Sequence, residues 1–194
     1  MANLYTMENA KNQEDTEMSK RKGIEDTRPS WNEYFLQLAK DVSLRSNCSR
    51  RKVGAVIVND NHIVATGYNG TPAKTTNCFD GGCLRCNSDH KTGEKLDECL
   101  CVHAEQNAIC QAAKHGNAID GGCIYITCSP CLTCLKMIIN SGIRKVVFGE
   151  WYREFNDQEK RLIEESGIVV HLYDPVEGSM MRRAIKKFRE RKRA

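Results

Sequence analysis

Four residues in the second half of the chain have the types and the spacing of a metal centre with an adjacent proton carrier. His103 and Glu105 are separated by one residue, and Cys131 and Cys134 follow as a Cys-x-x-Cys pair after a proline. One imidazole and two thiolates make three zinc ligands, which leave the fourth tetrahedral position open for water, as in catalytic zinc sites. Zinc lowers the pKa of such a water toward neutrality, and Glu105 can carry its proton to a substrate. The spacing therefore predicts a catalytic zinc site.

Each half of this pattern also has an ordinary structural explanation. A single His-x-Glu is common on helix surfaces, and a single Cys-x-x-Cys in an intracellular chain indicates a redox pair or a structural zinc. The two together, in this order, are more specific, because only catalysis explains both the open ligand position and the carboxylate.

Cys128 offers a second way to pair the downstream cysteines, because Cys128 and Cys131 are also separated by two residues. The pattern predicts a buried strand over residues 123–128, and Pro130 suits the first position of a helix. Cys131 and Cys134 then lie one turn apart at a helix N-terminus, where the helix dipole favours thiolates. We therefore assign these two as ligands. The cysteines expected to be small buried residues are Cys110, Cys123 and Cys128.

A second group of cysteines lies upstream. Those that fall within 24 residues are Cys78, Cys83, Cys86, Cys99 and Cys101. Thiols at this density in a reducing compartment indicate metal, because a closed four-thiolate zinc can hold a loop that has no core. Scattered buried cysteines are the alternative. With the more remote Cys48, six candidates imply either one site with spare cysteines or two sites that share them.

The composition is that of one globular domain. The chain has 194 residues, 40% of them hydrophobic, which suffices for one core and is short for two. We find no run of about 18 apolar residues and no signal-peptide core. Eleven cysteines at metal spacings predict a cytoplasmic or nuclear setting. The net charge of +4 suits an anionic substrate without implying nucleic acid.

The first third of the chain is expected to contain a tail, a helix and a hairpin. Residues 1–28 are polar and predict a disordered tail. Ser30 is a candidate N-cap of an amphipathic helix that extends to about residue 46. Apolar runs at 53–58 and 62–67, separated by a polar turn, predict a β-hairpin with both strands largely buried.

The second half alternates between helices and strands. The expected elements are a helix over 102–114, a strand over 122–128, a helix over 131–141, a strand over 144–148, a helix over roughly 155–166 and a strand over 168–173. Gly142 and Gly167 fall where C-cap glycines are expected. Together with the hairpin, this alternation predicts an α/β fold with a mixed five-stranded sheet between helices.

The C-terminal residues 176–194 are strongly basic. Met181, Ile185 and Phe188 form a weak apolar stripe, which favours a solvated terminal helix or tail. The alternative is a nucleic-acid or nuclear-import patch.

With these residues, the chain resembles the deoxycytidylate (dCMP) deaminase family of the cytidine deaminase-like superfamily. The order His-x-Glu then Pro-Cys-x-x-Cys is the signature of zinc deaminases. The likeness to fungal-type members includes residues 28–31, the run 67–72 and the cysteine-rich insert 75–101. The resemblance covers roughly residues 30–175 and implies a three-layer α/β/α domain over 29–175.

The resemblance also implies a reaction, the hydrolysis of dCMP to dUMP with release of ammonia, which supplies dUMP for thymidylate synthesis. His103, Cys131 and Cys134 match the family's zinc ligands, and Glu105 matches its proton shuttle. Some members hold a further, structural zinc. Their cysteines match Cys48 and Cys78, and a third ligand position matches Cys101. The insert additionally offers Cys83, Cys86 and Cys99.

Further residues match positions that bind nucleotides in the family. Asn69 matches an asparagine that hydrogen-bonds the sugar, and Tyr152 lies where relatives carry an aromatic residue near the base or sugar. Backbone groups near Ala104 and Thr127 are candidates for the base edge. The run Gly67-Tyr68-Asn69-Gly70 is linked to allosteric regulation, in which dCTP with Mg²⁺ activates and dTTP inhibits, usually in a homohexamer. Without the resemblance, this run would be an ordinary turn.

Two other functions are open. One is a polynucleotide deaminase that acts on tRNA or single-stranded DNA, supported only by the basic C-terminus. Such a protein needs a salt-sensitive surface with aromatic stacking groups, and only 7% of the residues are aromatic. The other is a non-catalytic, zinc-stabilised interaction module, which would not need Glu105.

The basic candidates for binding a substrate phosphate are Arg45, Arg50, Arg51, Lys52 and Lys74.

Overall fold

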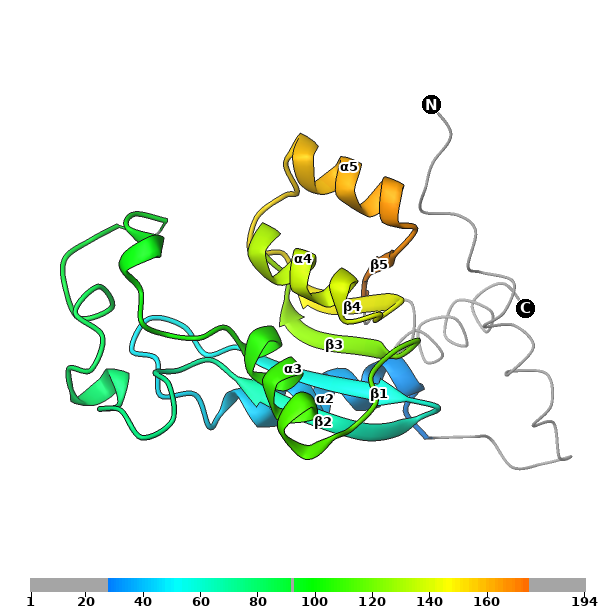
Figure 1. Ribbon diagram of the computed structural model, residues 1–194, viewed down its shortest axis with the longest axis horizontal. Helices are drawn as coiled ribbons and strands as arrows, with labels where there is room; N and C mark the ends of the chain where they lie inside the picture. The colour runs from blue at the N-terminus through cyan, green and yellow to red at the C-terminus, as the bar shows by residue number, and fades with distance from the viewer. Residues whose placement is uncertain (1–27, 92, 175–194) are drawn as a thin grey trace, which may run out of the picture.

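The computed structural model describes residues 28–91 and 93–174 (Figure 1). The first element in this part of the chain is a helix. Ser30 caps α2 (Trp31–Ser43) as predicted, and its hydroxyl accepts a hydrogen bond from the Glu33 amide at 3.2 Å. The helix ends three residues before the predicted residue 46. The predicted N-terminal tail, except Arg28, and the basic C-terminal segment lie outside the described residues.

Strands β1 (Gly54–Asn59) and β2 (His62–Tyr68) form the predicted hairpin. Asp60 and Asn61 make its two-residue turn with φ values of 46° and 60°, the left-handed conformation that matches the twist of tight hairpins. β1 is buried almost throughout. β2 is an edge strand in which His62, Ile63, Thr66 and Tyr68 are exposed, so the prediction that both strands are buried is wrong for β2.

The second half of the domain alternates between helices and strands, as predicted. Its elements are α3 (Ala104–His115), β3 (Cys123–Cys128), α4 (Leu132–Asn140), β4 (Lys145–Glu150), α5 (Asp157–Ser166) and β5 (Val169–Leu172). The sheet order is β2-β1-β3-β4-β5. β1 pairs antiparallel with β2 and β3, whereas β3, β4 and β5 run parallel, so the mixed five-stranded sheet is confirmed. Gly167 caps α5 as predicted, and Gly142 lies one residue beyond the C-cap of α4.

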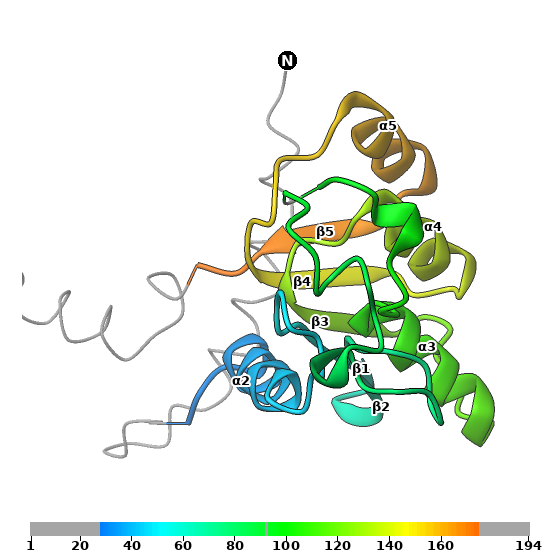
Figure 2. The same ribbon diagram turned by 90° about the vertical axis from the view of Figure 1, so that its left-hand side faces the viewer.

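Helices cover both faces of the sheet, which gives three layers (Figure 2). α2 packs on one face, where Phe35 and Leu36 contact Val56 and Val147. On the other face α3 presents a stripe of small residues, Ala104, Ala108 and Ala112, all fully buried. Within residues 28–91 and 93–174, no helix is long and apolar enough to cross a membrane.

A long insert between β2 and α3, residues 71–101, extends beyond one end of the sheet (Figure 1). Its regular structure, in the residues described, is limited to two 3₁₀ turns, Cys78–Asp80 and Leu96–Glu98. The two ends of the insert are joined by Gly70 and Val102, whose backbone groups exchange hydrogen bonds of 3.1 and 2.8 Å. This bridge fixes the residues that immediately precede α3.

Candidate active site

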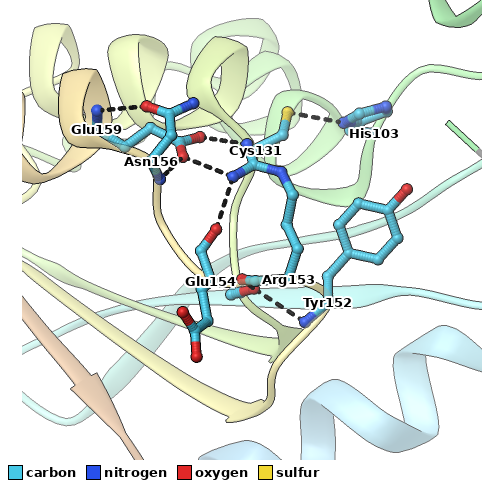
Figure 3. Close-up of polar contacts among 8 residues, drawn as sticks. His103, Cys131, Tyr152, Arg153, Glu154, Asn156 and Glu159 are labelled. Carbon is cyan, nitrogen blue, oxygen red and sulfur yellow. Dashed lines mark hydrogen bonds and ion pairs between the residues drawn. The ribbon is translucent and has the colours of Figure 1, made fainter.

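The three predicted catalytic-metal ligands meet where α3 and α4 begin (Figure 3). His103 is the N-cap of α3, Cys131 is the N-cap of α4, and Cys134 lies in the first turn of α4. His103 Nδ1 lies 3.3 Å from Cys134 Sγ and 3.5 Å from Cys131 Sγ. A tetrahedral zinc with ordinary Zn–N and Zn–S lengths separates such atoms by about 3.5 Å. The residues present therefore fit a zinc ion held by three protein ligands.

A local hydrogen bond holds the start of α3, and backbone conformation sets the start of α4. The Gln106 side chain accepts a hydrogen bond from the His103 amide at 3.0 Å, as in a capping box. Pro130 was expected at the first position of α4 but precedes the N-cap, because Cys131 is still extended with φ −81° and ψ 167°. The helix therefore begins at Leu132, and Cys131 and Cys134 remain one turn apart.

The ligand side chains polarise one another. Hydrogen bonds from Cys134, in competition with burial, and from His103 lower the pKa of Cys131 to about 4. The neighbouring Cys131 sulfur and burial raise the pKa of Cys134, and contact with Cys131 raises the pKa of His103. One sulfur is therefore a thiolate at neutral pH even without metal, which suits a metal ligand.

Glu105 lies beside this triad in the first turn of α3 and is only 4% exposed. Burial raises the pKa of its carboxyl, and the nearby His103 opposes that shift only in part. A carboxyl with a raised pKa holds a proton more readily than a free carboxyl does, and a general acid–base needs this protonated form.

The ends of neighbouring strands bring further predicted residues to the site. The backbone amide of Tyr152 donates a hydrogen bond to Ser129 Oγ at 3.0 Å. Its ring extends toward His103 (Figure 3). The Arg51 guanidinium lies 4.6 Å from the centre of that ring. Thr127 Oγ1 accepts a hydrogen bond of 3.3 Å from the first residue of β1. Roles for Tyr152 and Thr127 in substrate binding stay predictions.

Sequence reasoning missed an ion pair that supports the start of α4. Arg153 donates to both carboxylate oxygens of Glu159 at 2.7 and 2.5 Å (Figure 3). Burial opposes ionisation, but Arg153 and the amides of Asn156 and Leu132 hold the pKa of Glu159 below its ordinary value. Since Leu132 follows the ligand Cys131, this buried carboxylate ties α5 to the metal site. The available signal was the Asn-x-x-Glu capping-box spacing of residues 156 and 159.

Asn69 is buried, and its side-chain amide forms hydrogen bonds with the segment that leads into β1. Its Oδ1 accepts hydrogen bonds from the Ser46 hydroxyl at 2.7 Å and the Val53 amide at 2.8 Å. Its Nδ2 donates to the Arg51 carbonyl at 2.8 Å. The side chain therefore helps to place Arg51 beside the site. The predicted contact between Asn69 and a sugar stays a prediction.

Gly67 and Tyr68, the first half of the run 67–70, border a cavity of about 380 Å³ between the end of β2, α3 and the start of the insert. Residues Tyr68, Lys74 and Asn107 line it. Of the other basic candidates for binding phosphate, Arg50 donates hydrogen bonds to the carbonyls of Cys86 and Ser88 and so contacts the insert. The cavity lies at the predicted regulatory motif, and effector binding there stays a prediction.

The cysteines outside the catalytic triad divide into two groups. Cys128 is buried as predicted, Cys123 is half-buried, and Cys110 is exposed, so its predicted burial is wrong. Cys110 lies off the alanine stripe that faces the sheet. The six predicted structural-metal cysteines form one cluster, with two sets of four sulfurs each within 4.8 Å of one another. The sets are Cys48, Cys78, Cys86 and Cys101, and Cys83, Cys86, Cys99 and Cys101.

The fold is that of the cytidine and deoxycytidylate deaminase zinc-binding family. The chain belongs to that family, whose model matches residues 29–150. It is 44% identical over 156 residues to a protein of Schizosaccharomyces pombe named deoxycytidylate deaminase, covering 79% of this chain and 47% of the relative. The ComE operon protein 2 of Bacillus subtilis is 41% identical over 144 residues, covering 74% of this chain and 71% of the relative.

A second relative named deoxycytidylate deaminase, from Saccharomyces cerevisiae, is 42% identical over 146 residues, covering 75% of this chain and 46% of the relative. The chain thus spans about half the length of the two yeast relatives. The crystal structure of dCMP deaminase from the cyanophage S-TIM5 in complex with dCMP and dUMP is also similar, with 35% identity and a TM-score of 0.60. The alignment covers 75% of this chain and 98% of the phage chain, which confirms the predicted fold class.

Proposed function

We propose that this protein hydrolyses dCMP to dUMP and ammonia. The observation that carries the proposal is the buried Glu105 beside a three-ligand site formed by His103, Cys131 and Cys134. The names of the relatives and the nucleotides in the phage complex support the choice of substrate.

The reaction adds water at C4 of the cytosine ring and releases the amino group as ammonia. Zinc bound by His103, Cys131 and Cys134 would supply a water of lowered pKa next to the carboxylate. Glu105 takes a proton from this water and delivers it to N3 of the base. It then carries the second proton of the water to the departing amine. The raised pKa of Glu105 lowers the cost of the protonated form through which both transfers pass.

Residues around the triad would hold the nucleotide. Backbone groups near Ala104 and Thr127 bind the base edge, Asn69 binds the sugar, and the Tyr152 ring packs against base or sugar. Arg51, which lies over that ring, is the basic residue best placed to meet the phosphate, since its charge lies beside the proposed nucleotide site. The six-cysteine cluster holds structural zinc and thereby orders the insert.

We place the site for regulatory nucleotides in the cavity beside Gly67 and Tyr68. There dCTP with Mg²⁺ activates and dTTP inhibits, in a homohexamer of domains that span residues 29–175. Lys74 in the cavity wall would complement the charge of a triphosphate. The dUMP produced supplies thymidylate synthesis. None of the eleven cysteines, all of which lie in the described residues, forms a disulfide, which suits a reducing compartment such as the cytosol.

The test is ammonia release by the purified, zinc-loaded chain. The substrates are dCMP, CMP, deoxycytidine, dCTP and a cytosine-containing single-stranded DNA, each with and without dCTP and Mg²⁺ as effector. We expect turnover of dCMP, raised by dCTP and lowered by dTTP. Activity confined to the single strand would replace this proposal by a polynucleotide deaminase. No activity on any substrate, with all zinc sites filled, would favour a non-catalytic zinc module.

A further inference from the structure

The six clustered cysteines come from three separate parts of the chain. Cys48 follows α2 and Cys101 precedes α3, whereas the other four belong to the insert. The buried hydrophobic cluster at this place consists of these cysteines alone. The larger apolar side chains of the insert are exposed instead, namely Phe79, Leu84, Leu96 and Leu100. The insert therefore has sulfur atoms where a domain normally has a hydrocarbon core.

The sulfur positions are those of metal ligands and not those of disulfides. Neighbouring Sγ atoms lie 3.6–3.9 Å apart, whereas a disulfide bond is about 2.05 Å long. Two thiolates bound to one tetrahedral zinc, each at about 2.3 Å, are about 3.8 Å apart. The distances between neighbouring Sγ atoms of the cluster match that separation.

The two sets of four sulfurs share Cys86 and Cys101. Cys86 Sγ lies 3.9 Å from Cys48, 3.6 Å from Cys99 and 3.9 Å from Cys101, so it contacts members of both sets. Two independent tetrahedral sites would require eight thiolates. Six thiolates complete two sites when two of them bridge the ions. Six thiolates and two Zn²⁺ also carry a net charge of −2, the same as one zinc with four thiolates.

A single ion would leave one fully buried thiol unused, whichever set it occupied. Cys83 belongs only to one set and Cys78 only to the other, and both are fully buried. Each sulfur also receives a backbone amide at 3.4 Å, from Leu100 and Ser49 respectively. Hydrogen bonds of this kind favour the thiolate form. Each set thus contains one fully buried sulfur that accepts a backbone amide hydrogen bond.

We propose that the insert holds a binuclear Zn₂Cys₆ cluster, in which Cys86 and Cys101 bridge the two ions. Cys48 and Cys78 complete the coordination of one ion, and Cys83 and Cys99 complete that of the other. This inference rests on the proposal that the cluster holds structural zinc, and it is independent of the deaminase activity. The cluster joins the segment after α2, the insert and the residue two positions before His103.

The first test counts zinc in the full chain, purified with a reductant, by native mass spectrometry and elemental analysis. We expect three zinc ions per chain, one at the catalytic triad and two in the cluster. Two ions would retain the structural zinc but overturn the binuclear cluster. One ion would overturn structural zinc altogether and leave the deaminase proposal standing. Cys83→Ser should bind two ions, whereas the control Cys110→Ser, at an exposed cysteine, should bind three.

The second test does not depend on a variant that must fold. The wild-type chain is loaded with ¹¹³Cd in place of zinc and examined by ¹¹³Cd NMR. Two all-thiolate cadmium signals that split each other by coupling through the bridging sulfurs are expected, beside a third signal from the catalytic site. One all-thiolate signal, or two without mutual coupling, would overturn the bridged arrangement.

Discussion

Glu105 and Glu159 are both buried carboxyls, and their surroundings move their pKa values in opposite directions. Burial dominates at Glu105 and raises its pKa. At Glu159, burial is overcome by Arg153 and by backbone amides, so that the pKa is lowered. Two carboxyls with divergent pKa values can perform different tasks. Glu105 is suited to exchange protons, whereas Glu159 is stabilised as an anion and positions the start of α4.

Replacing Glu105 by Gln removes the proton carrier and keeps the size and shape of the side chain. We expect turnover of dCMP to fall by about 10²–10⁴-fold or more, the usual contribution of a positioned general acid–base. The zinc content and the thermal unfolding of the variant should stay close to those of the wild type. Ammonia release, elemental analysis and calorimetry measure these three quantities. Glu98→Gln, at an exposed carboxyl on the insert, is the control that should keep full turnover. Comparable activity in Glu105→Gln would contradict the proposed mechanism.

Replacing Glu159 by Gln should destabilise the domain, because it leaves the Arg153 charge partly buried and unpaired. The expected loss at pH 7 is about 1–3 kcal/mol, less than for a fully buried pair, because Arg153 is 42% exposed and solvent screens it. Since the pKa of Glu159 is lowered by folding, its stabilising effect is present above the ordinary carboxyl pKa. The effect is lost as the pH falls through the lowered pKa of the folded state.

Urea unfolding of both proteins at matched zinc content, from pH 7 downward, measures this difference. The control is Glu165→Gln, because Glu165 belongs to an exposed ion pair with Arg161 on the same helix and should contribute little. A stability difference that did not shrink in acid would show that Glu159 acts through packing and not through its charge.

At the scale of elements, β2 and α3 approach each other at Gly67. A Cβ atom added there would overlap the backbone oxygen of Ala104 and the backbone nitrogen of Ala108. The first half of the motif 67–70 therefore has a packing role in addition to any role in regulation. Because the N-cap of α3 is His103, a proposed zinc ligand, the distance between sheet and helix also sets the position of the candidate active site.

Gly67→Ala should force α3 away from the sheet. We expect a loss of stability of several kcal/mol, or failure to fold, since backbone atoms cannot yield as a flexible side chain can. The matched control is Gly149→Ala in β4, where the added Cβ would lie 3.2 Å from the Thr127 carbonyl oxygen and needs only a small shift. Both changes restrict the unfolded chain alike. Chemical unfolding and zinc content measure the outcome, and equal stability of the two variants would refute this packing role.

Elements with local signals were predictable from the sequence, and those set by tertiary neighbours were not. Ser30 starts α2 because a capping hydroxyl acts within its own turn. The exposure of β2 depends on its place at the sheet edge, which no local pattern reveals. Cys110 could have been placed correctly, because the alanines 104, 108 and 112 already mark the buried face of α3. The partition of the six cysteines required the folded insert.

At the scale of the whole molecule, the cysteine cluster and the active site share one stretch of chain. Cys101 belongs to the cluster, Val102 bridges to Gly70, and His103 is a proposed ligand of the catalytic zinc. The sheet domain has its own two hydrophobic clusters, whereas the buried apolar residues in the described part of the insert are cysteines. One part of the domain is therefore stabilised by hydrocarbon packing, and we propose that the other part depends on metal.

Removal of zinc should consequently open the insert before it unfolds the sheet. The side chain of Arg85 is buried in the insert and donates to the carbonyls of Lys91 and Glu94, so trypsin should cut after it only when the insert opens. We expect the bond after Arg85 to resist trypsin in the zinc-loaded chain and to be cut after chelation under reducing conditions. The bond after Lys145 in β4 should resist in both states, because the sheet keeps its apolar core. Mass spectrometry of the fragments locates each cut, and restoring zinc should restore protection of Arg85. Equal cleavage after Arg85 with and without zinc would mean that metal does not keep the insert closed.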